Sequence, residues 1–404
     1  MTPVSEALKL VSENVSPTGI ENVPLLECLG RVVAQDLASR LSHPPVAVSS
    51  MDGYALRAAD TGNSPVVLKQ IGESQAGGGF TGTLGSGQTV RIFTGAPLPN
   101  GADAVQMQEN TNADGQDITI EQSVPTNHFV RAAGMDFADG DVLIKAGTVL
   151  GARHIGLAAA MNLASLPVRR KPRVAILATG NEVAMPGDVL GPSQIISSNS
   201  FALHSYVIAM GGEPVVMGIA GDSEEQLHAA LEGAMDCDVL VTIGGVSVGD
   251  YDLVGKVLKE KGLKQIFHKI AMRPGKPLLF GKIDELVVFG MPGNPVSTGV
   301  CSMLFLKTAL AIMLGISADE TPLQSVVLGQ DIDANDLRQD YLRARLESGP
   351  EGELVAMPFS KQDSAMQARF AEADCLIVRK PHAPAIKAGE RVEILFLRGS
   401  LISL

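Results

Sequence analysis

Apolar residues recur at helical spacing at the start of the chain. Val4, Ala7, Leu8 and Val11 share one face, which predicts a short amphipathic helix over residues 3–14. An extended piece, a turn and a short apolar element follow, and residues 141–170 return to a strand and then a helix. We therefore group residues 1–43 and 141–170 in one N-terminal α/β domain.

Between these stretches the pattern changes to short apolar segments broken by glycine. VVLKQIG, TVRIFTGAPLPNGADAVQMQE and DITIEQ have the spacing of strands and turns. This pattern predicts an inserted all-β domain over residues 44–140.

Residues 171–319 alternate apolar strands with helical patterns. The predicted strands are RVAILATG, EPVVMGIAG, DVLVTIGG, QIFHKIAM and ELVVFGMPG, and the predicted helices are SNSFALHSYVIAMGG, DSEEQLHAALEGAM, YDLVGKVLKEKG and NPVSTGVCSMLFLKTALAIML. Such alternation is typical of a doubly wound, mostly parallel sheet with helices on both faces. In the last of these helices, Lys307 at the middle of the apolar run would cost about 2.5–3.5 kcal/mol in a bilayer, so we expect a core helix.

Residues 320–404 are β-like again. QSVVLGQDI, DYLRARLES, ELVAMPFS, DCLIVRK and ERVEILFL follow one another at short intervals, which predicts a small C-terminal barrel or sandwich. The fold class is thus a multidomain protein with a central α/β domain, an inserted β domain upstream and a C-terminal β-barrel-like domain.

Composition narrows the function. The formal charge of −12 argues against sequence-independent binding to nucleic acid or to an anionic membrane. The four cysteines are far apart and form no C-x-x-C pair, so we expect buried small residues rather than a zinc or redox site. The N-terminus has no basic region before an apolar run, so a cytoplasmic location is expected.

Polar residues collect where the predicted parallel strands end. ATGNE supplies Glu182, AGDSEE supplies Asp222, and TIGGVSVGDYD supplies Gly244, Gly245, Ser247, Gly249, Asp250 and Asp252. MRPGKP adds Arg273 and Lys276, and MPGNP adds Pro292, Gly293, Asn294 and Pro295. Ligands bind at this edge of such sheets.

Each motif alone has a structural interpretation. Asp222 is a good N-cap for the helix that follows, PGNP is a turn before a helix, and Gly244–Gly245 could serve tight strand-to-helix geometry. The glycine spacing fits neither a P-loop nor a dinucleotide fingerprint.

The set as a whole indicates an anion site with a metal. Backbone amides at glycine turns and helix N-termini bind phosphate-like anions, whereas a nearby aspartate would repel them by about 3 kcal/mol at about 5 Å. A divalent cation between them removes this conflict, so we expect a nucleotide or phosphoester site with Mg²⁺. In the β domain, Asp52 and Thr94 stand in MDGYA and FTGAP, and the D-G pair could equally be a hairpin turn.

Taken in order, SSMDGYALR, RIFTGAPLPNGADAVQMQE, ILATGNEV, IGGVSVGDYD, RPGKP and MPGNPVS closely resemble the molybdopterin molybdenumtransferase family. The C-terminal enzymatic part of gephyrin is similar too. The resemblance implies a homodimer of elongated four-domain subunits whose N-terminal domain makes dimer contacts. It also implies Mg²⁺-dependent conversion of adenylylated molybdopterin and molybdate to molybdenum cofactor with release of AMP. Other cofactor synthesis proteins are expected as further partners.

The resemblance also implies roles for individual residues. Asp52, Thr94, Asp136, Glu182, Asp222, Asp252, Arg273 and Lys276 match catalytic positions. The acids Asp52, Glu182, Asp222 and Asp252 are the expected metal ligands. Gly244, Gly245, Ser247, Gly249, Pro292, Gly293, Asn294, Pro295, Arg338, Arg343 and Ser364 match substrate-binding positions.

The chain departs from the family pattern at four places. Met135 replaces the glutamate before Asp136, Asn181 replaces a frequent aspartate, and Arg273 replaces the commoner lysine. The Q-G-S motif becomes Gln362-Asp363-Ser364-Ala365, which places an acid where glycine would leave room for an anion.

Three other functions stay open. The α/β domain alone also resembles molybdopterin adenylyltransferases, and a related module occurs in nicotinamide-nucleotide amidases that lack MDGYA and FTGAP. A non-enzymatic, gephyrin-like scaffold is the third.

Overall fold

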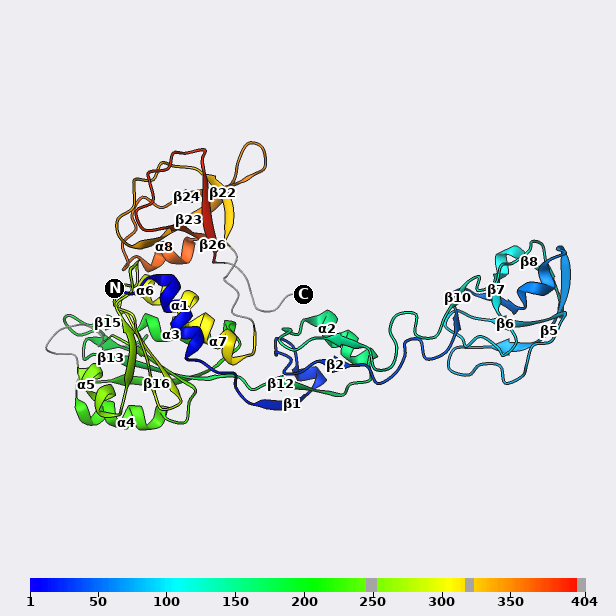
Figure 1. Cartoon of the computed structure of the whole chain (residues 1–404), viewed down its shortest axis with the longest axis horizontal. Coiled ribbons are helices and arrows are strands. Elements are labelled where there is room, and N and C mark those ends of the chain that lie inside the picture. Colours follow the sequence, from blue (N-terminus) through cyan, green and yellow to red (C-terminus); the bar gives the residue numbers. More distant parts are fainter. Residues whose placement is uncertain (222, 245–252, 317–322, 398–404) are drawn as a thin grey trace.

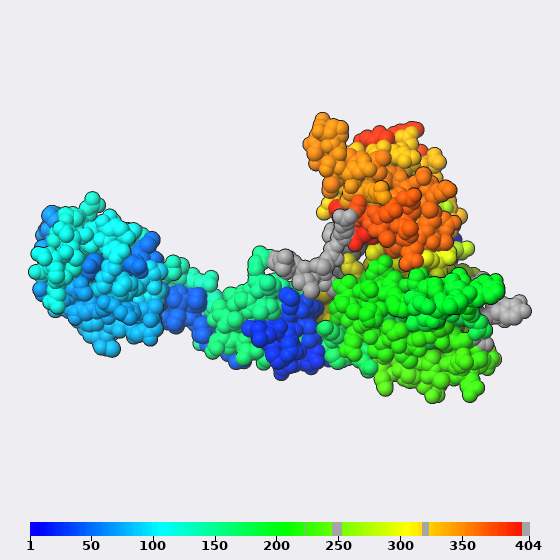
Figure 2. All heavy atoms as spheres, turned by 180° about the vertical axis from the view of Figure 1, so that it is seen from behind, coloured from blue at the N-terminus to red at the C-terminus, as the bar shows by residue number. Residues whose placement is uncertain are grey.

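The molecule is elongated, with its units spread along one axis (Figure 1). The computed structural model describes residues 1–221, 223–244, 253–316 and 323–397. An α/β unit and a small barrel lie together at one end, a middle unit follows, and a β lobe lies at the far end. The space-filling view shows that this distal lobe is joined to the rest by a narrower neck (Figure 2).

The α/β unit is built on a six-stranded mixed sheet in the order β16-β13-β17-β21-β20-β18. Its strands are β13 (Arg173–Thr179), β16 (Glu213–Ala220), β17 (Val239–Ile243), β18 (Lys264–His268), β20 (Leu279–Ile283) and β21 (Leu286–Met291). The neighbours β16, β13, β17 and β21 are parallel, whereas β20 is antiparallel to β21 and β18 to β20. The sequence missed β20, and the expected strand QIFHKIAM is divided between β18 and β19 (Met272–Arg273), with Lys269 at a φ of 68° between them.

Strand alternation explains why helices cover both faces of this sheet. Successive residues of β13 point to opposite faces, so Val174 and Ile176 join one core and Ala175 and Leu177 the other. The first core contains α3 (Ser198–Ala209) and the helix that starts at Pro295, and the second contains α4 (Glu224–Ala234) and α5 (Leu253–Glu260).

The long apolar helix is a core element. It runs through α6 (Pro295–Cys301), a π-helical turn (Ser302–Leu306) and α7 (Lys307–Met313). Pro295–Met313 has the length and hydropathy of a membrane span, but 67% of its most apolar window is buried inside the protein. The first helix, α1 (Val4–Glu13), buries Val4, Ala7 and Val11 in the same core, although the sequence grouped it with residues 15–43.

The C-terminal unit is a closed barrel beside this domain. Five strands pair in the order β23-β24-β22-β26-β25, and β25 pairs back to β23. They are β22 (Gln324–Leu328), β23 (Gln339–Ser348), β24 (Leu354–Pro358), β25 (Cys375–Arg379) and β26 (Arg391–Phe396), all anticipated by the pattern. The short helix α8 (Gln367–Glu372) packs on α6, and β19 pairs with β23, and both contacts join the barrel to the α/β unit.

The middle unit is assembled from two separate parts of the chain. Its elements are β1 (Ile20–Pro24), β2 (Leu37–Ala38), β11 (Val142–Ile144), α2 (Ala152–Ala160) and β12 (Ser165–Arg169), and β1 pairs with β12 and β2 with β11. Phe137, which the sequence assigned to the inserted domain, packs in this unit's core.

The distal lobe contains a six-stranded sheet in the order β7-β4-β6-β5-β9-β8. The strands are β4 (Gly53–Leu56), β5 (Val66–Ser74), β6 (Gln88–Ile92), β7 (Ala104–Met107), β8 (Thr111–Asp114) and β9 (Asp117–Ile120). A small pair, β3 (Val48–Ser49) with β10 (Val130–Arg131), lies where the lobe meets the neck. The predicted fold class is confirmed: a central α/β domain, an inserted β domain and a C-terminal barrel.

Candidate functional site

Strand register brings the predicted loops of the α/β unit to one edge. Thr179 pairs with Ala220, Ala178 with Ile243, and Ile243 with Met291. The segments that begin at residues 180, 221, 244 and 292 therefore leave the sheet side by side. Because Leu279 of antiparallel β20 pairs with Gly290, the RPGKP loop before it reaches the same edge.

The end of β13 places a carboxylate over the sheet edge. Gly180 has a φ of 119°, a conformation that favours glycine, and a Cβ there would lie 2.4 Å from Glu182 Oε2, so the carboxylate lies directly against the Gly180 backbone. Glu182 is exposed, and no hydrogen bond or ion pair engages its carboxylate within the described residues. This carboxylate is available to a ligand.

The loop after β16 lies beside the loop after β13. A Cβ on Gly221 would lie 3.1 Å from Asn181 Oδ1, which shows how close the β13 and β16 loops are. Ser223, rather than the expected Asp222, caps α4 by accepting a hydrogen bond from the Gln226 N–H. Asp222 itself lies outside the described residues.

Only the first residue of the glycine-rich loop after β17 is described. Gly244 has a φ of 81°, a conformation that favours glycine, and its N–H donates to the Met291 carbonyl at 3.1 Å. Of the other predicted residues, Gly245, Ser247, Gly249, Asp250 and Asp252 lie outside the described residues.

The PGNP turn is held by side chains that the sequence analysis did not select. Asn199 Nδ2 donates to the Gly293 carbonyl at 2.7 Å, and Thr298 Oγ1 donates to the Pro292 carbonyl. Gly293 is exposed and borders open space. Pro295 is the first residue of α6 and Asn294 precedes it as the N-cap residue.

The barrel supplies Ser364 to this turn. Asn294 Nδ2 donates to Ser364 Oγ at 2.8 Å, and the Val296 N–H donates to the Ser364 carbonyl at 3.1 Å. Asp363 Oδ1 accepts from the Ala365 N–H at 2.8 Å, so this carboxylate stabilises its own turn. Ser364 thus lies at the candidate site despite the altered motif.

The two cations of RPGKP have different surroundings. Lys276 is exposed, and its ammonium group has no hydrogen bond or ion pair with another described residue. Arg273 instead pairs with Asp340 and, at 3.4 Å, with Asp336. The hydrogen bond to Asp340 raises the pKa of Arg273. Arg338 pairs with Asp336 at 3.2 Å, so Asp336 is shared by Arg273 of the α/β unit and Arg338 of the C-terminal unit.

Arg343 is 1% exposed and lies on the outer face of the barrel, on the same side of β23 as Tyr341, which packs in the core of the α/β unit. Its backbone N–H and Nε donate to Gln362 Oε1 at 3.0 and 3.2 Å, and Nη1 donates to the Met366 carbonyl at 3.3 Å. Burial lowers the pKa of Arg343. These contacts support the segment that carries Ser364, and they leave Arg343 no exposed surface for a ligand.

Asp52 and Thr94 form a second cluster in the distal lobe. The Thr94 N–H and Oγ1 donate to Asp52 Oδ1 at 2.7 and 2.8 Å, with the backbone bond contributing most to a lowered Asp52 pKa. Arg91 lies nearby, 5.0 and 5.1 Å from the Tyr54 and Phe93 ring centroids. Sequence reasoning missed Arg91, although it stands three residues before Thr94.

The D-G pair is not a hairpin turn. Gly53 is a buried residue of β4, and a Cβ there would lie 1.9 Å from the Gln106 carbonyl oxygen of β7. Glycine is required because the strand backbones approach closely.

The distal lobe and the α/β edge are far apart within one chain. They lie at opposite ends of the long axis, so one chain does not bring Asp52 and Thr94 to Glu182 (Figure 1). Asp136 is exposed in the neck, where its N–H donates to the His43 carbonyl at 3.0 Å. Among the described ranges, no three acidic, histidine or cysteine residues gather as a metal site.

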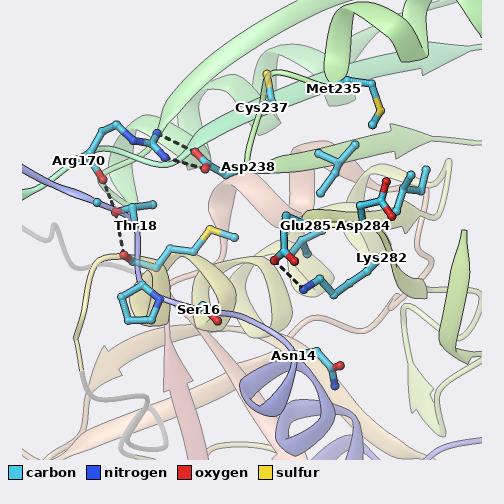
Figure 3. A pocket seen from close by; sticks show the side chains of 16 residues that line it. Asn14, Ser16, Thr18, Arg170, Met235, Cys237, Asp238, Lys282, Asp284 and Glu285 are labelled. Carbon is cyan, nitrogen blue, oxygen red and sulfur yellow. Dashed lines mark hydrogen bonds and ion pairs between the residues drawn. The ribbon is translucent and has the colours of Figure 1, made fainter. Parts of the chain in front are cut away.

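A cavity of about 430 Å³ lies on the opposite side of the α/β unit. It is lined by residues that precede the parallel strands, and Figure 3 shows its charged groups turned to one another. Arg170 makes a bidentate pair with Asp238 at 2.9 and 2.7 Å, and Lys282 pairs with Glu285 at 3.4 Å. We place the candidate site at the carboxyl-end edge instead.

Comparison with known proteins agrees with this arrangement. Residues 2–162 match the model of the MoeA N-terminal region (domain I and II), residues 175–311 that of a probable molybdopterin binding domain, and residues 325–397 that of the MoeA C-terminal region (domain IV).

Full-length relatives give the same result. The molybdopterin molybdenumtransferase of Bacillus subtilis is 32% identical, over 98% of this chain and 94% of its own length. Molybdopterin molybdenumtransferase 2 of Mycobacterium tuberculosis is 34% identical, over 86% of this chain and 88% of its own. A solved molybdopterin biosynthesis MoeA protein from Pyrococcus horikosii superposes with a TM-score of 0.87 at 35% identity and covers 99% of this chain and 100% of its own. The chain therefore belongs to the molybdopterin molybdenumtransferase family.

Proposed function

We propose that this protein transfers molybdenum from molybdate to adenylylated molybdopterin and releases AMP. The observation that carries the proposal is the edge of the α/β sheet, where Glu182, Gly244, Gly293 and Lys276 come from neighbouring loops in a chain of this family. The names of the full-length relatives support the same transfer reaction.

The residues at this edge suit an anionic substrate. Lys276 offers an ammonium group that has no partner among the described residues, while Gly244 and Gly293 let backbone approach a phosphate or molybdate oxygen. Because Arg273 is already paired with Asp340, we assign it to orienting the loop more than to neutralising substrate. Ser364 would add a hydroxyl from the barrel side.

Glu182 fits a role in holding Mg²⁺. Its carboxylate is exposed and has no partner among the described residues, and carboxylate oxygens are preferred magnesium ligands. Asp222 and Asp252, in the adjoining loops, would complete the acidic set. When bound, the ion would neutralise charge on the phosphate that leaves with AMP.

A homodimer would complete the site. Asp52 and Thr94 cannot reach Glu182 within one chain, so the distal lobe of a second copy would supply them. The middle unit exposes apolar side chains that suit contacts between subunits: Ile20 is 55% exposed, Leu26 94% and Leu29 52%. We further propose that the dimer works in the cytoplasm with other cofactor synthesis proteins.

The experiment is to mix purified protein with adenylylated molybdopterin and follow AMP, with and without molybdate and Mg²⁺. Release that requires both is the expected result. Release independent of molybdate, or ATP consumption with formation of the adenylylated compound, would contradict the proposal. The second outcome would indicate an adenylyltransferase.

A further inference from the structure

A cavity of about 270 Å³ opens at the end of the C-terminal barrel next to Arg273. Its walls include Asp340, Leu342, Phe359, Gln362 and Arg379. The volume is just below the roughly 300–1,000 Å³ of typical small-molecule sites, so it suits one or two fused rings.

Two buried charged side chains line this cavity with unused hydrogen-bonding atoms. Asp340 and Arg379 are each 3% exposed, and they are directly paired residues of β23 and β25, so their side chains extend from the same face. Within the described residues, Asp340 Oδ1 and Arg379 Nε and Nη1 have no hydrogen-bond partner. A buried polar atom without a hydrogen-bond partner destabilises the folded protein, and more so when it carries charge.

Each side chain is fixed from its other side. Asp340 Oδ2 accepts from Arg273, and Arg379 Nη2 donates to the carbonyls of Ala383 and Pro384. The atoms without partners are therefore held in place, so that the acceptor Asp340 Oδ1 is fixed on the same face as the donors Arg379 Nε and Nη1.

The Asp340 carboxylate and the Arg379 guanidinium together determine which kind of ligand the cavity can bind. A carboxylate only accepts and a guanidinium only donates. An oxyanion such as phosphate or molybdate would meet the Asp340 carboxylate, and a cation would meet Arg379. A neutral ring whose edge carries an N–H beside a carbonyl satisfies both, and Leu342 and Phe359 provide apolar walls for a flat ring.

We propose that this cavity binds the amino-lactam edge of a pterin, with the Asp340 carboxylate accepting from the ring N–H and from the 2-amino group beside it, and Arg379 donating to the ring carbonyl. The inference rests on the proposed function, whose substrate contains a pterin and an adenine. Since the sheet edge holds the groups proposed to bind phosphate and molybdate, the barrel cavity is left for the pterin ring. Guanine has the same edge, so guanosine is the competing source of this chemistry.

The test measures fluorescence anisotropy of 6-hydroxymethylpterin, which is favourable because the protein has no tryptophan. We expect saturable binding to the full-length protein and displacement by unlabelled pterin more readily than by guanosine. Adenosine, and a lumazine analogue in which a carbonyl replaces the 2-amino group, should compete at least about tenfold more weakly, as expected for one buried unmatched polar group.

Variants test the assignment to this cavity. Arg379→Gln should weaken pterin binding about tenfold or more, whereas Arg391→Gln, an exposed arginine of β26 outside the cavity, should leave it unchanged. If Arg379→Gln unfolds, the lumazine comparison on the wild-type protein decides alone.

Equal competition by lumazine or adenosine would overturn the proposal, as would tighter binding of guanosine. If lumazine or adenosine competes as well as pterin while molybdate-dependent AMP release is intact, only the assignment of this cavity is refuted. If no AMP is released, the proposed function is refuted.

Discussion

At the scale of single residues, Asp52 shows how a short motif prepares a carboxylate. Thr94 supplies both hydrogen bonds to the same oxygen, Oδ1, and Arg91 adds a favourable positive charge. These contacts lower the pKa of Asp52 below that of an ordinary aspartate, which is about 3.9. The other carboxylate oxygen remains available for a ligand.

Thr94→Val removes one of the two hydrogen bonds and should raise the pKa of Asp52. Because the native pKa is lowered, any stability from this carboxylate is present above the unfolded-state pKa and is lost as pH falls through the native value. The acidic limb of activity should move to higher pH in the variant. Carboxyl carbon NMR titration measures the pKa directly.

Thr119→Val is the matched control, because Thr119 lies on β9 in the same lobe and pairs there with Val67 and Asn112 through its backbone. It should leave the Asp52 pKa unchanged. An unshifted Asp52 pKa in Thr94→Val would show that Thr94 does not control this carboxylate.

Gln362→Leu tests the support beneath Ser364. The change leaves the buried Arg343 N–H groups without their acceptor, which should cost about 1–3 kcal/mol of unfolding free energy. Urea denaturation measures the loss. Gln367→Leu, an exposed change in α8, should stay within about 0.5 kcal/mol of wild type. Equal stability of the two variants would contradict the account.

Sequence alone identified many residues of the candidate site but not how they are used. Glu182, Lys276 and Ser364 lie where the motifs predicted, at one edge. Arg343 was expected to bind substrate but is buried, because a residue pattern does not show which side chains a neighbouring unit covers. Asn199 acts through a hydrogen bond to the Gly293 carbonyl, and Gln362 through hydrogen bonds with Arg343 and Phe359. Such contacts give no periodic signal in a sequence.

At the scale of elements, the spacing of apolar residues along the chain predicted most of the helices and strands of the α/β unit. Parallel strands buried on both faces give continuous apolar runs, and β13, β17 and β21 are such strands. The pattern failed at β20, where the strand LFGKI follows its proline-rich loop directly and turns back through Asp284 at a φ of 49°. The run of apolar residues in β20 is too short for the sequence pattern to distinguish a strand from a loop.

Gly299 should be essential for docking the barrel on α6. A Cβ at this position would lie 2.3 Å from Phe370 Cε1 of α8. Gly299→Ala should therefore destabilise the protein by about 1–3 kcal/mol through overpacking, measured by thermal or urea denaturation.

Gly156→Ala provides the opposite case in the same kind of element. Gly156 lies in α2 with open space around its Cα, so alanine should stabilise the protein by about 0.5–1 kcal/mol through helix propensity. A Gly299→Ala protein as stable as Gly156→Ala would show that the α6–α8 contact adapts freely.

At the scale of the whole molecule, the sequence predicted the kinds of domain but not their separation. Nothing in the pattern places the distal lobe at the far end from the α/β edge, because domain arrangement depends on the neck and the middle unit rather than on periodicity. This separation is why Asp52 and Glu182 require two subunits in the proposed site.

The most direct measurement mixes two inactive variants, Asp52→Ala and Glu182→Ala, and follows molybdate-dependent AMP release. If each site combines the distal lobe of one subunit with the α/β edge of the other, random exchange of subunits should restore about a quarter of wild-type activity, since heterodimers retain one intact site. Each variant alone should stay inactive. No recovery after confirmed subunit exchange would contradict a site shared between two copies of the chain.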